Sequence, residues 1–447
     1  MLAYATDSEP KARRGVRFAL DGGTRRAMLL IIALALALRL AVTLAFEPLP
    51  PVFSDAEYYD AAARALAAGD GYKVMISEDS FRPGAWPTAF FPPGYSFFLA
   101  GFYLLLGAGV EVARYANLLA GVLTVPVVYL IGARLLGPRE GLVAALLAAI
   151  SPSLILWTPV LLSETFFTLL FGLALLFVVD TLRGGGRLIG VEAALAGAAI
   201  GLAVLTRGQA LVLLPVAIVW WRLSGASSGA TLTAGALATL ATLLVLTPWA
   251  LRNLNTFDEP VLLSTNFGYN LRIGHAPYSN GRFVDPVDLY ELIDEGENLE
   301  LTLNSEGTRL AVDYVLDNPG RELDLTWAKM RWLWSPDTDV VLWLDSFGRT
   351  PVDGTTSSLL QWLVRAGHWL VLALLLPAVV ALTPRHRAVV LAALLALGWT
   401  AVHVVFFGEP RYHLPLLPLL LPLAAAGGLA LWDRLPTRRA PEPSRAR

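Results

Sequence analysis

The stretch that decides the fold is RYANLLAGVLTVPVVYLIGARLLGPREGLVAALLAAISP, residues 114–152. It contains two long apolar runs, separated by the short polar segment RLLGPRE at 134–140. A helix needs roughly 20 apolar residues to cross a hydrocarbon core of about 30 Å. The two runs therefore predict membrane-spanning helices at 113–134 and 140–160.

The composition of the 447-residue chain points the same way. Hydrophobic residues make up 55% and charged residues 16%, with a mean hydropathy of +0.58. A soluble protein carries about 25% charged residues. A net charge of -2 and a pI near 6.2 exclude a nucleic-acid-binding domain. The absence of cysteine excludes disulfides, thiolate metal sites and a cysteine nucleophile. We predict an all-α polytopic membrane protein.

The same length criterion predicts about ten spans. They are 27–46, 113–134, 140–160, 164–182, 188–205, 209–222, 231–250, 361–382, 388–407 and 413–432. Lys and Arg gather at one end of these spans, including the tails 1–26 and 433–447. Positive segments stay on the cytoplasmic side. We expect a multi-pass protein of the plasma (inner) membrane with both termini cytoplasmic and its active site on the outer face.

Two segments are then expected outside, 47–112 and 251–360. Within the first, the apolar stretch 92–106 is too short to span and is predicted to be an interfacial helix. Half of the 36 Asp and Glu residues lie in 251–360, which also contains an amphipathic helical run at 303–333. We predict a small outer subdomain at 251–360, between a transmembrane module at 27–250 and the last helices at 361–432.

The first outer loop opens with FSDAEYYDAAARALAAGDGY, residues 53–72. Ser54 and Glu57 have the spacing of a capping box, and Gly69 ends the helix. Asp55 in the first turn favours the helix dipole. It also fits a general base or metal ligand at the mouth of a membrane cavity. Both interpretations stay open.

Three further charges are expected at the outer membrane boundary. Arg82 precedes the interfacial helix and is either a snorkelling anchor or a phosphate contact. Glu164 either belongs to a helix start or orients a cation or an acceptor hydroxyl. Arg207, at the end of a span, is an anchor or a phosphate contact.

The segments LTPWALRN (246–253) and NFGYNLRIGHAPYSNG (266–281) supply Arg252, Arg272 and His275. These groups could bind an anion or sugar hydroxyls, although a histidine satisfied within its loop is the commoner case. The closing GEPRYHLPLLP contributes the last candidates, Arg411 and Tyr412. An ion pair between Glu409 and Arg411 is the alternative interpretation there.

The order of these motifs resembles the bacterial glycosyltransferase family 39 group. Its relatives are the protein O-mannosyltransferases and the lipid A aminoarabinose transferases, which share the GT-C membrane fold. The resemblance implies that Asp55 is the catalytic carboxylate and that Glu164 faces the catalytic cavity. Glu57 matches a second acid, but Ala56 intervenes where many relatives have adjacent Asp and Glu. Arg207 matches a basic residue near the lipid phosphate.

The resemblance also implies a polyprenyl-phosphate sugar as donor, used on the non-cytoplasmic side. The PPGY element at 92–95 then walls the donor groove, and Tyr58 and Tyr95 are candidate substrate contacts. A single displacement would invert the anomeric centre. Asp55 would act as the base, or with Glu164 as ligand of a divalent cation such as Mg²⁺ or Mn²⁺. The candidate phosphate clamps are Arg82, Arg207, Arg272 and Arg411.

The acceptor is expected to be a hydroxyl of a protein, lipid or glycan. A lipid-linked oligosaccharide ligase or polymerase remains an alternative, since its donor differs only in carrying a diphosphate. A secondary transporter should show repeated halves and interrupted spans. It is less favoured because the sequence shows no internal repeat.

Overall fold

The computed structural model describes residues 21–46, 54–74, 85–182, 189–292, 298–346 and 352–434. Within these ranges the regular secondary structure is almost entirely helical. The exception is a two-stranded antiparallel pair, β1 (Lys73–Val74) with β2 (Trp86–Pro87), in which Lys73 lies opposite Pro87. The predicted all-α membrane fold is confirmed.

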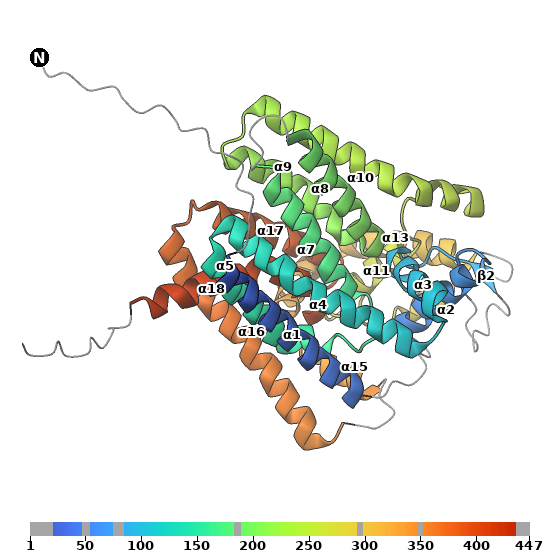
Figure 1. Cartoon of the computed structure of the whole chain (residues 1–447). Coiled ribbons are helices and arrows are strands. Elements are labelled where there is room, and N and C mark those ends of the chain that lie inside the picture. The colour runs from blue at the N-terminus through green and yellow to red at the C-terminus, as the bar shows by residue number, and fades with distance from the viewer. Residues whose placement is uncertain are drawn as a thin grey trace, which may run out of the picture.

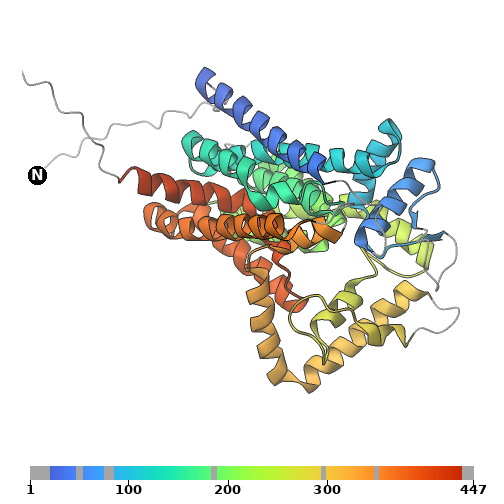
Figure 2. The ribbon, with the colours of Figure 1, turned by 90° about the horizontal axis from the view of Figure 1, so that it is seen from below.

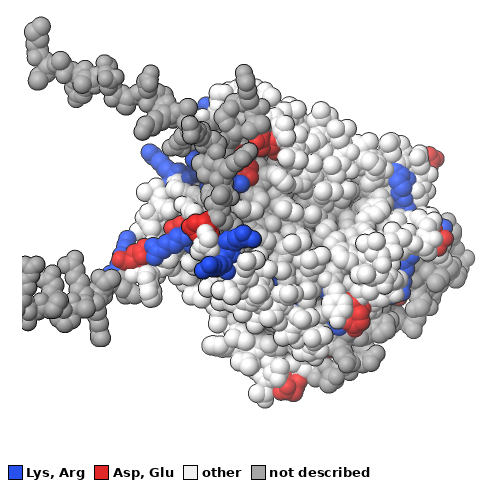
Figure 3. Space-filling model, viewed as in Figure 1, with Lys and Arg blue, Asp and Glu red and all other residues white. Residues whose placement is uncertain are grey.

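Six helical segments in the described part of the chain are long and apolar enough to cross a membrane. They are α1 (Gly22–Ala45), α4 (Val110–Leu135), α10 (Ser228–Phe257), α16 (Gly354–Leu382), α17 (Arg387–Val405) and Pro410–Trp432, which joins η2 (Pro410–Leu416) to α18 (Leu417–Trp432). Figures 1 and 2 show these helices in one bundle. In Figure 3 charged side chains gather toward the two ends of the bundle, and a broad uncharged belt separates them. That belt is what a lipid-facing surface requires.

The remaining predicted spans are shorter or interrupted helices. They are α5 (Pro138–Ile150) with α6 (Pro152–Leu156), α7 (Glu164–Asp180), α8 (Ile189–Thr206), and η1 (Gly208–Val212) with α9 (Leu213–Leu223). The prediction of one helix over 140–160 was wrong. Pro152 lacks an N–H and restricts the residue before it, and Ser151 accordingly has an extended ψ of 118°.

Burial separates central from peripheral helices. The run Leu417–Gly427 of α18 is buried throughout, and α4 and α7 are buried along most of their length. By contrast, α1, α10, α16 and α17 leave most of their apolar windows uncovered by protein. The central helices therefore form the framework that positions the polar residues at one end of the bundle.

One end of the bundle, here termed the loop end, carries the extramembrane elements. They are α2 (Asp55–Ala68), α3 (Gly94–Leu106), α11 (Phe267–Gly274), α12 (Val287–Tyr290), α13 (Leu299–Asp317), α14 (Pro319–Leu333) and α15 (Asp339–Ser346). Figure 2 shows α13 and α14 as an angled pair standing away from the bundle axis. The helical run expected over 303–333 is broken at Asn318, which precedes Pro319. The segment between α10 and α16, here termed the subdomain, is 258–353 and shorter than the predicted 251–360, because α10 continues to Phe257 and α16 starts at Gly354.

Helix α3 is held against α8 by a close approach at its first residue. A Cβ at Gly94 would lie 2.5 Å from Thr206 Oγ1 and 2.8 Å from the carbonyl oxygen of Leu205. At its other end, Leu104, Leu105 and Leu106 are exposed. The 13-residue α3 is too short to cross a bilayer and presents an apolar tip, as expected for an interfacial helix.

Candidate active site at the loop end

The centre of the site is a buried ion pair between two neighbouring helices. Glu164 is the first residue of α7 and is only 3% exposed. Its Oε1 accepts a 2.6 Å hydrogen bond from Arg207 Nη2, just beyond α8. Arg207 Nε also donates to Ser163 Oγ at 2.8 Å. The guanidinium is thus fixed by hydrogen bonds to two neighbours, which the planar array of arginine donors allows.

A second arginine reaches the same carboxylate from the last hairpin. Arg411, in η2, places Nη1 3.4 Å from Glu164 Oε1. Tyr412 lies between the two cations, with its ring centroid 5.7 Å from the guanidinium carbon of Arg207 and 5.6 Å from that of Arg411. Glu409 instead binds Arg282, at 3.0 Å, so the ion pair considered between Glu409 and Arg411 is not the one that forms.

Helix α2 brings Asp55 to this cluster. Asp55 is the first residue of α2 and is partly buried. Burial raises its pKa, and the charge of Arg411 opposes that rise, as does that of Arg207, while Glu164 adds to it. The Asp55 carboxyl therefore lies within electrostatic reach of all three charges. Asp55, Glu164, Arg207 and Arg411, here termed the charge cluster, come from four separate segments.

Tyr59, one turn along α2 from Asp55, was missed in the sequence. Its ring is 4% exposed and packs edge-on against Tyr95 at 5.1 Å. Burial and the nearby Asp55 raise the pKa of its hydroxyl, whereas a hydrogen bond with Ser163 lowers it. The sequence has Tyr58 and Tyr59 side by side, and only the helix phase decides which one faces the cluster.

Asp337 is a further acid that the sequence analysis did not single out. It lies between α14 and α15, is fully buried, and accepts a hydrogen bond from Trp157 Nε1. Its Oδ1 has no partner among the described residues. Arg411 and Glu164 both influence its pKa, so the segment between α14 and α15 brings this carboxyl close to the charge cluster. SPDTD, residues 335–339, contains two aspartates that look like ordinary turn residues, and no sequence signal distinguishes Asp337.

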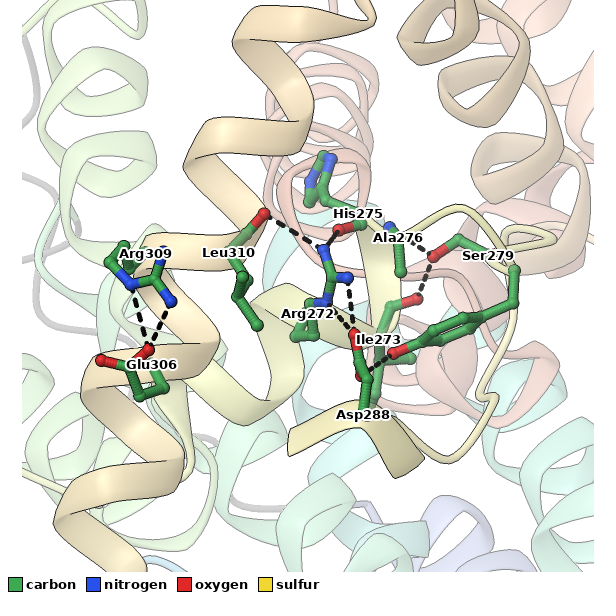
Figure 4. A network of polar contacts seen from close by, with 10 residues as sticks. Arg272, Ile273, His275, Ala276, Ser279, Asp288, Glu306, Arg309 and Leu310 are labelled. Atoms are coloured by element: carbon green, nitrogen blue, oxygen red, sulfur yellow. Dashed lines mark hydrogen bonds and ion pairs between the residues drawn. The ribbon is translucent and has the colours of Figure 1, made fainter. Parts of the chain in front are cut away.

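Several other predicted residues lie elsewhere and hold the loop end together. Arg272 donates to Asp288 and to the carbonyls of His275 and Leu310, as Figure 4 shows. His275 Nδ1 lies 2.7 Å from Glu322 Oε2, and its Nε2 lies 2.8 Å from the carbonyl oxygen of Val405. Arg272 is therefore joined to the subdomain's own framework, with every guanidinium nitrogen bonded, whereas His275 links the subdomain to the end of α17.

Arg252 also has a framework position. It donates to the carbonyl oxygens of Thr88 and Tyr72, both at 2.8 Å, and its guanidinium carbon lies 4.9 Å from the Trp249 ring centroid. It thereby ties the residues just before β1 and just after β2 to α10. Arg82 lies outside the described residues.

The aromatic candidates Tyr58 and Tyr95 lie in α2 and α3. Tyr58 packs against Phe90 and Phe91, at ring distances of 5.8 and 5.4 Å. Tyr95 is fully buried and donates to Asn117 Oδ1 at 3.2 Å.

The polar start of α2 differs in one respect from the prediction. Ser54 occupies the cap position of α2, but its side chain makes no capping hydrogen bond, so the predicted capping box is incomplete. Glu57 lies in the first turn and is partly buried. Gly69 ends the helix with a left-handed φ of 85°, as predicted.

Known proteins share both the sequence pattern and the fold around this site. The sequence model of a family described as dolichyl-phosphate-mannose-protein mannosyltransferase matches residues 91–251, which include Glu164 and Arg207. The apo oligosaccharyltransferase of Archaeoglobus fulgidus superposes with a TM-score of 0.56 at 16% identity, covering 92% of this chain and 51% of that one. The fold is the GT-C membrane fold. This chain spans about half the length of that enzyme.

Two further structures are similar. The same archaeal protein in complex with an inhibitory peptide and a dolichol-phosphate gives a TM-score of 0.54 at 14% identity, with coverage of 93% and 51%. ArnT from Cupriavidus metallidurans in the apo state gives 0.42 at 17% identity, with coverage of 91% and 78%. None of the curated proteins matches the sequence.

The residues present do not make a good divalent-cation site. Within the described ranges, no three His, Asp or Glu side chains gather as ligands. Oε1 of Glu164 faces two guanidinium groups, whose positive charges repel a cation, and a hard cation needs several oxygens free to bind it. The expected pairing of Asp55 with Glu164 around Mg²⁺ or Mn²⁺ therefore does not fit this arrangement of charges.

Proposed function

We propose that this protein is a membrane glycosyltransferase that moves a sugar from a polyprenyl-phosphate donor to an acceptor hydroxyl on the non-cytoplasmic side. The observation that carries the proposal is the charge cluster. A carboxyl in partly buried surroundings, a buried acid and two arginines meet at the loop end, where an apolar interfacial helix also lies. That combination suits a donor with an apolar tail and an anionic leaving group, and an acceptor whose hydroxyl is the nucleophile.

Asp55 is the general base of the proposed reaction. An acceptor hydroxyl is a poor nucleophile until a carboxylate takes its proton. Burial raises the pKa of Asp55, which makes it a better proton acceptor, while Arg411 limits that rise. The acceptor oxygen attacks the anomeric carbon, the bond from that carbon to the phosphate oxygen breaks, and the proton passes to Asp55. One displacement inverts the anomeric centre.

Arg207 and Arg411 stabilise the leaving group. The departing polyprenyl phosphate gains negative charge as its bond to the sugar breaks, and preorganised cations lower the energy of that state. Glu164 Oε1 accepts a hydrogen bond from Arg207 and lies 3.4 Å from Arg411 Nη1, so that both positive charges are gathered at one oxygen before the donor arrives. In this role Glu164 is a positioning residue for the phosphate clamp.

The names of the similar proteins support a lipid-linked donor. One is described as a dolichyl-phosphate-mannose-protein mannosyltransferase family, and another structure holds an oligosaccharyltransferase with dolichol-phosphate. The likeness to an oligosaccharyltransferase also favours a second candidate, transfer of an oligosaccharide from a diphosphate-linked lipid. The two candidates differ in the donor and share the site.

The test is a donor panel with purified protein and host lipid and acceptor fractions. Radiolabelled polyprenyl-monophosphate sugars and a polyprenyl-diphosphate oligosaccharide are compared for transfer of label. Asp55→Asn should lower turnover by about 10²–10⁴-fold, the usual contribution of a general base. Asp70→Asn alters an exposed acid in the same loop and should leave turnover unchanged. Turnover of the diphosphate donor alone would favour the second candidate, and full activity in Asp55→Asn would refute the assignment of the base.

A further inference from the structure

Residues 404–409, here termed the connecting segment, join the end of α17 to the start of η2 and lie against the subdomain. Two residues after this segment comes Arg411, one of the two arginines of the charge cluster. A shift of the connecting segment would therefore move Arg411 relative to Glu164. The contacts that hold the segment in place thus bear directly on the site.

Two glycines allow a close approach between the connecting segment and the subdomain. The Gly408 N–H donates to the carbonyl oxygen of Gly281 at 2.9 Å, and a Cβ at Gly408 would overlap the carbonyl oxygen of Lys329. Likewise, a Cβ at Gly274 would overlap the carbonyl oxygen of Phe406. The connecting segment is therefore packed backbone to backbone against α11 and α14.

Two side chains of the subdomain cap the end of α17. Lys329 Nζ donates to the carbonyl oxygen of Val404 at 3.0 Å, and His275 Nε2 lies 2.8 Å from that of Val405. Because a carbonyl oxygen only accepts, Nε2 carries the hydrogen in this contact. The last carbonyls of a helix have no partner within it, and a cation there also favours the helix dipole. Figure 4 shows the His275 side chain pointing away from Arg272 and its partners.

Packing alone does not explain a lysine at this position. Lys329 is 1% exposed, and burial lowers its pKa to about 8, while the charge of Glu322 opposes that shift. Glu322 lies on the same helix and places Oε2 2.7 Å from His275 Nδ1. Burying an amine costs free energy that an apolar side chain would not. The lysine is explained by the carbonyl of Val404 that it caps.

Arg411 depends on support from its backbone more than Arg207 does. Arg207 makes two hydrogen bonds with side chains, to Ser163 Oγ and to Glu164 Oε1. Arg411 Nη1 lies 3.4 Å from the same Glu164 oxygen and has no hydrogen-bond partner among the described residues. The place of the Arg411 guanidinium is therefore set largely by where the connecting segment puts its backbone.

We propose that Lys329, together with His275, is a positioning residue for Arg411. By capping the last carbonyls of α17, the two side chains fix the connecting segment and, through it, the arginine that η2 contributes to the phosphate clamp. The subdomain thereby takes part in the reaction without touching the substrate at this point. The effect on catalysis rests on the proposed function, whereas the fixing of the connecting segment does not.

The first arm of the test follows the connecting segment by hydrogen exchange and needs no substrate. Lys329→Met keeps an unbranched side chain and removes the amine that caps Val404. The amide hydrogens of 406–409 should then exchange about tenfold faster or more, as expected for the loss of one charged hydrogen bond. Arg309→Met removes an exposed charge that pairs with Glu306 and Asp313 within α13, and should leave this exchange unchanged. Equal exchange in Lys329→Met and the wild type would overturn the proposal.

The second arm is kinetic and uses the donor found active, well below the melting temperature of each variant. Lys329→Met should lower kcat by about 10- to 100-fold, because a small displacement of a catalytic group is costly, with KM changed by less than about twofold. Arg309→Met should leave kcat unchanged. In an Arg411→Met background, Lys329→Met should cause less than about twofold further loss, since the group that it positions is already gone.

A residue that supports only the fold behaves differently. It would cause the same loss of kcat with or without Arg411, or would lower the melting temperature alone, and either result would overturn the positioning role. A wild-type protein that transfers no sugar from any donor would refute the proposed function. Faster exchange in Lys329→Met would in that case still support the fixing of the connecting segment.

Discussion

The carboxyl of Asp337 shows how strongly one residue's protonation can depend on the fold. It is fully buried beside Trp157, and burial raises its pKa well above the value of 3.8. Asp339 and Glu164 push in the same direction, while the indole hydrogen bond and Arg411 oppose them. The folded protein therefore holds this proton more tightly than the unfolded chain does.

This difference predicts a pH-dependent effect of Asp337→Asn. The stabilisation from the protonated Asp337 is complete below the unfolded pKa and is lost as pH rises through the raised folded pKa. Because the amide does not titrate, the melting temperature of the variant relative to wild type should rise as the pH increases from about 4 upward, above the unfolded pKa. Melting in detergent across that range measures it. Asp324→Asn, at a 76% exposed side chain, should leave a constant offset. A constant offset in Asp337→Asn as well would contradict the prediction.

At the residue scale, the sequence named every member of the charge cluster and missed Tyr59 and Asp337 beside it. Asp55, Glu164, Arg207 and Arg411 were all named, because each is a charge beside an apolar helix where lipid makes charge costly. Arg272 and His275 were named by the same reasoning and lie in the subdomain framework instead. The local sequence does not show whether a charged side chain binds other groups of the protein or faces a substrate. That depends on partner residues that lie far away along the chain.

At the element scale, helix α3 depends on the absence of a side chain at Gly94. A Cβ there would meet Thr206 Oγ1 at 2.5 Å and the Leu205 carbonyl at 2.8 Å. Gly94→Ala should therefore displace α3 from α8 and destabilise the protein by about 1–3 kcal/mol, the usual cost of overpacking. The measurement is thermal unfolding in detergent together with donor turnover, because Tyr95 moves with the helix.

Gly101 provides the matched control in the same helix. A Cβ at this position meets nothing within 4 Å, so Gly101→Ala adds helix propensity without a clash. Its melting temperature should equal or exceed that of the wild type. Equal destabilisation by both substitutions would show that α3 does not depend on the contact at Gly94.

Helix boundaries were predicted less well than helix existence. The break between α5 and α6 and the break between α13 and α14 both occur at a proline, Pro152 and Pro319. Apolar content alone made 140–160 look continuous, since hydropathy averages over a window and does not register one missing N–H. The DNPG turn signal at 317–320 was visible, yet the amphipathic period on either side of it suggested a single run.

At the scale of the whole molecule, composition predicted the membrane fold, and the arrangement of charges predicted its orientation. The bundle, with charges at both ends and an apolar belt between them, agrees with the first of these (Figure 3). The orientation rests on the positive-inside rule alone, because the packing of a helical bundle does not depend on which end faces the cytoplasm. Packing of the central helices α4, α7 and α18 brings the distant segments of the site together, and no local pattern encodes that contact.

The absence of cysteine makes the orientation directly testable. Ser305 in α13 and Ser228 at the start of α10 are both exposed and lie at opposite ends of the bundle. With each replaced singly, Ser305→Cys should react with a membrane-impermeant maleimide on intact cells, and Ser228→Cys only after permeabilisation. The cysteine-free parent reports the background, so either signal is unambiguous. The reverse pattern would place the charge cluster on the cytoplasmic face, where a donor used from outside could not reach Asp55, and the proposed sidedness of the reaction would have to be abandoned.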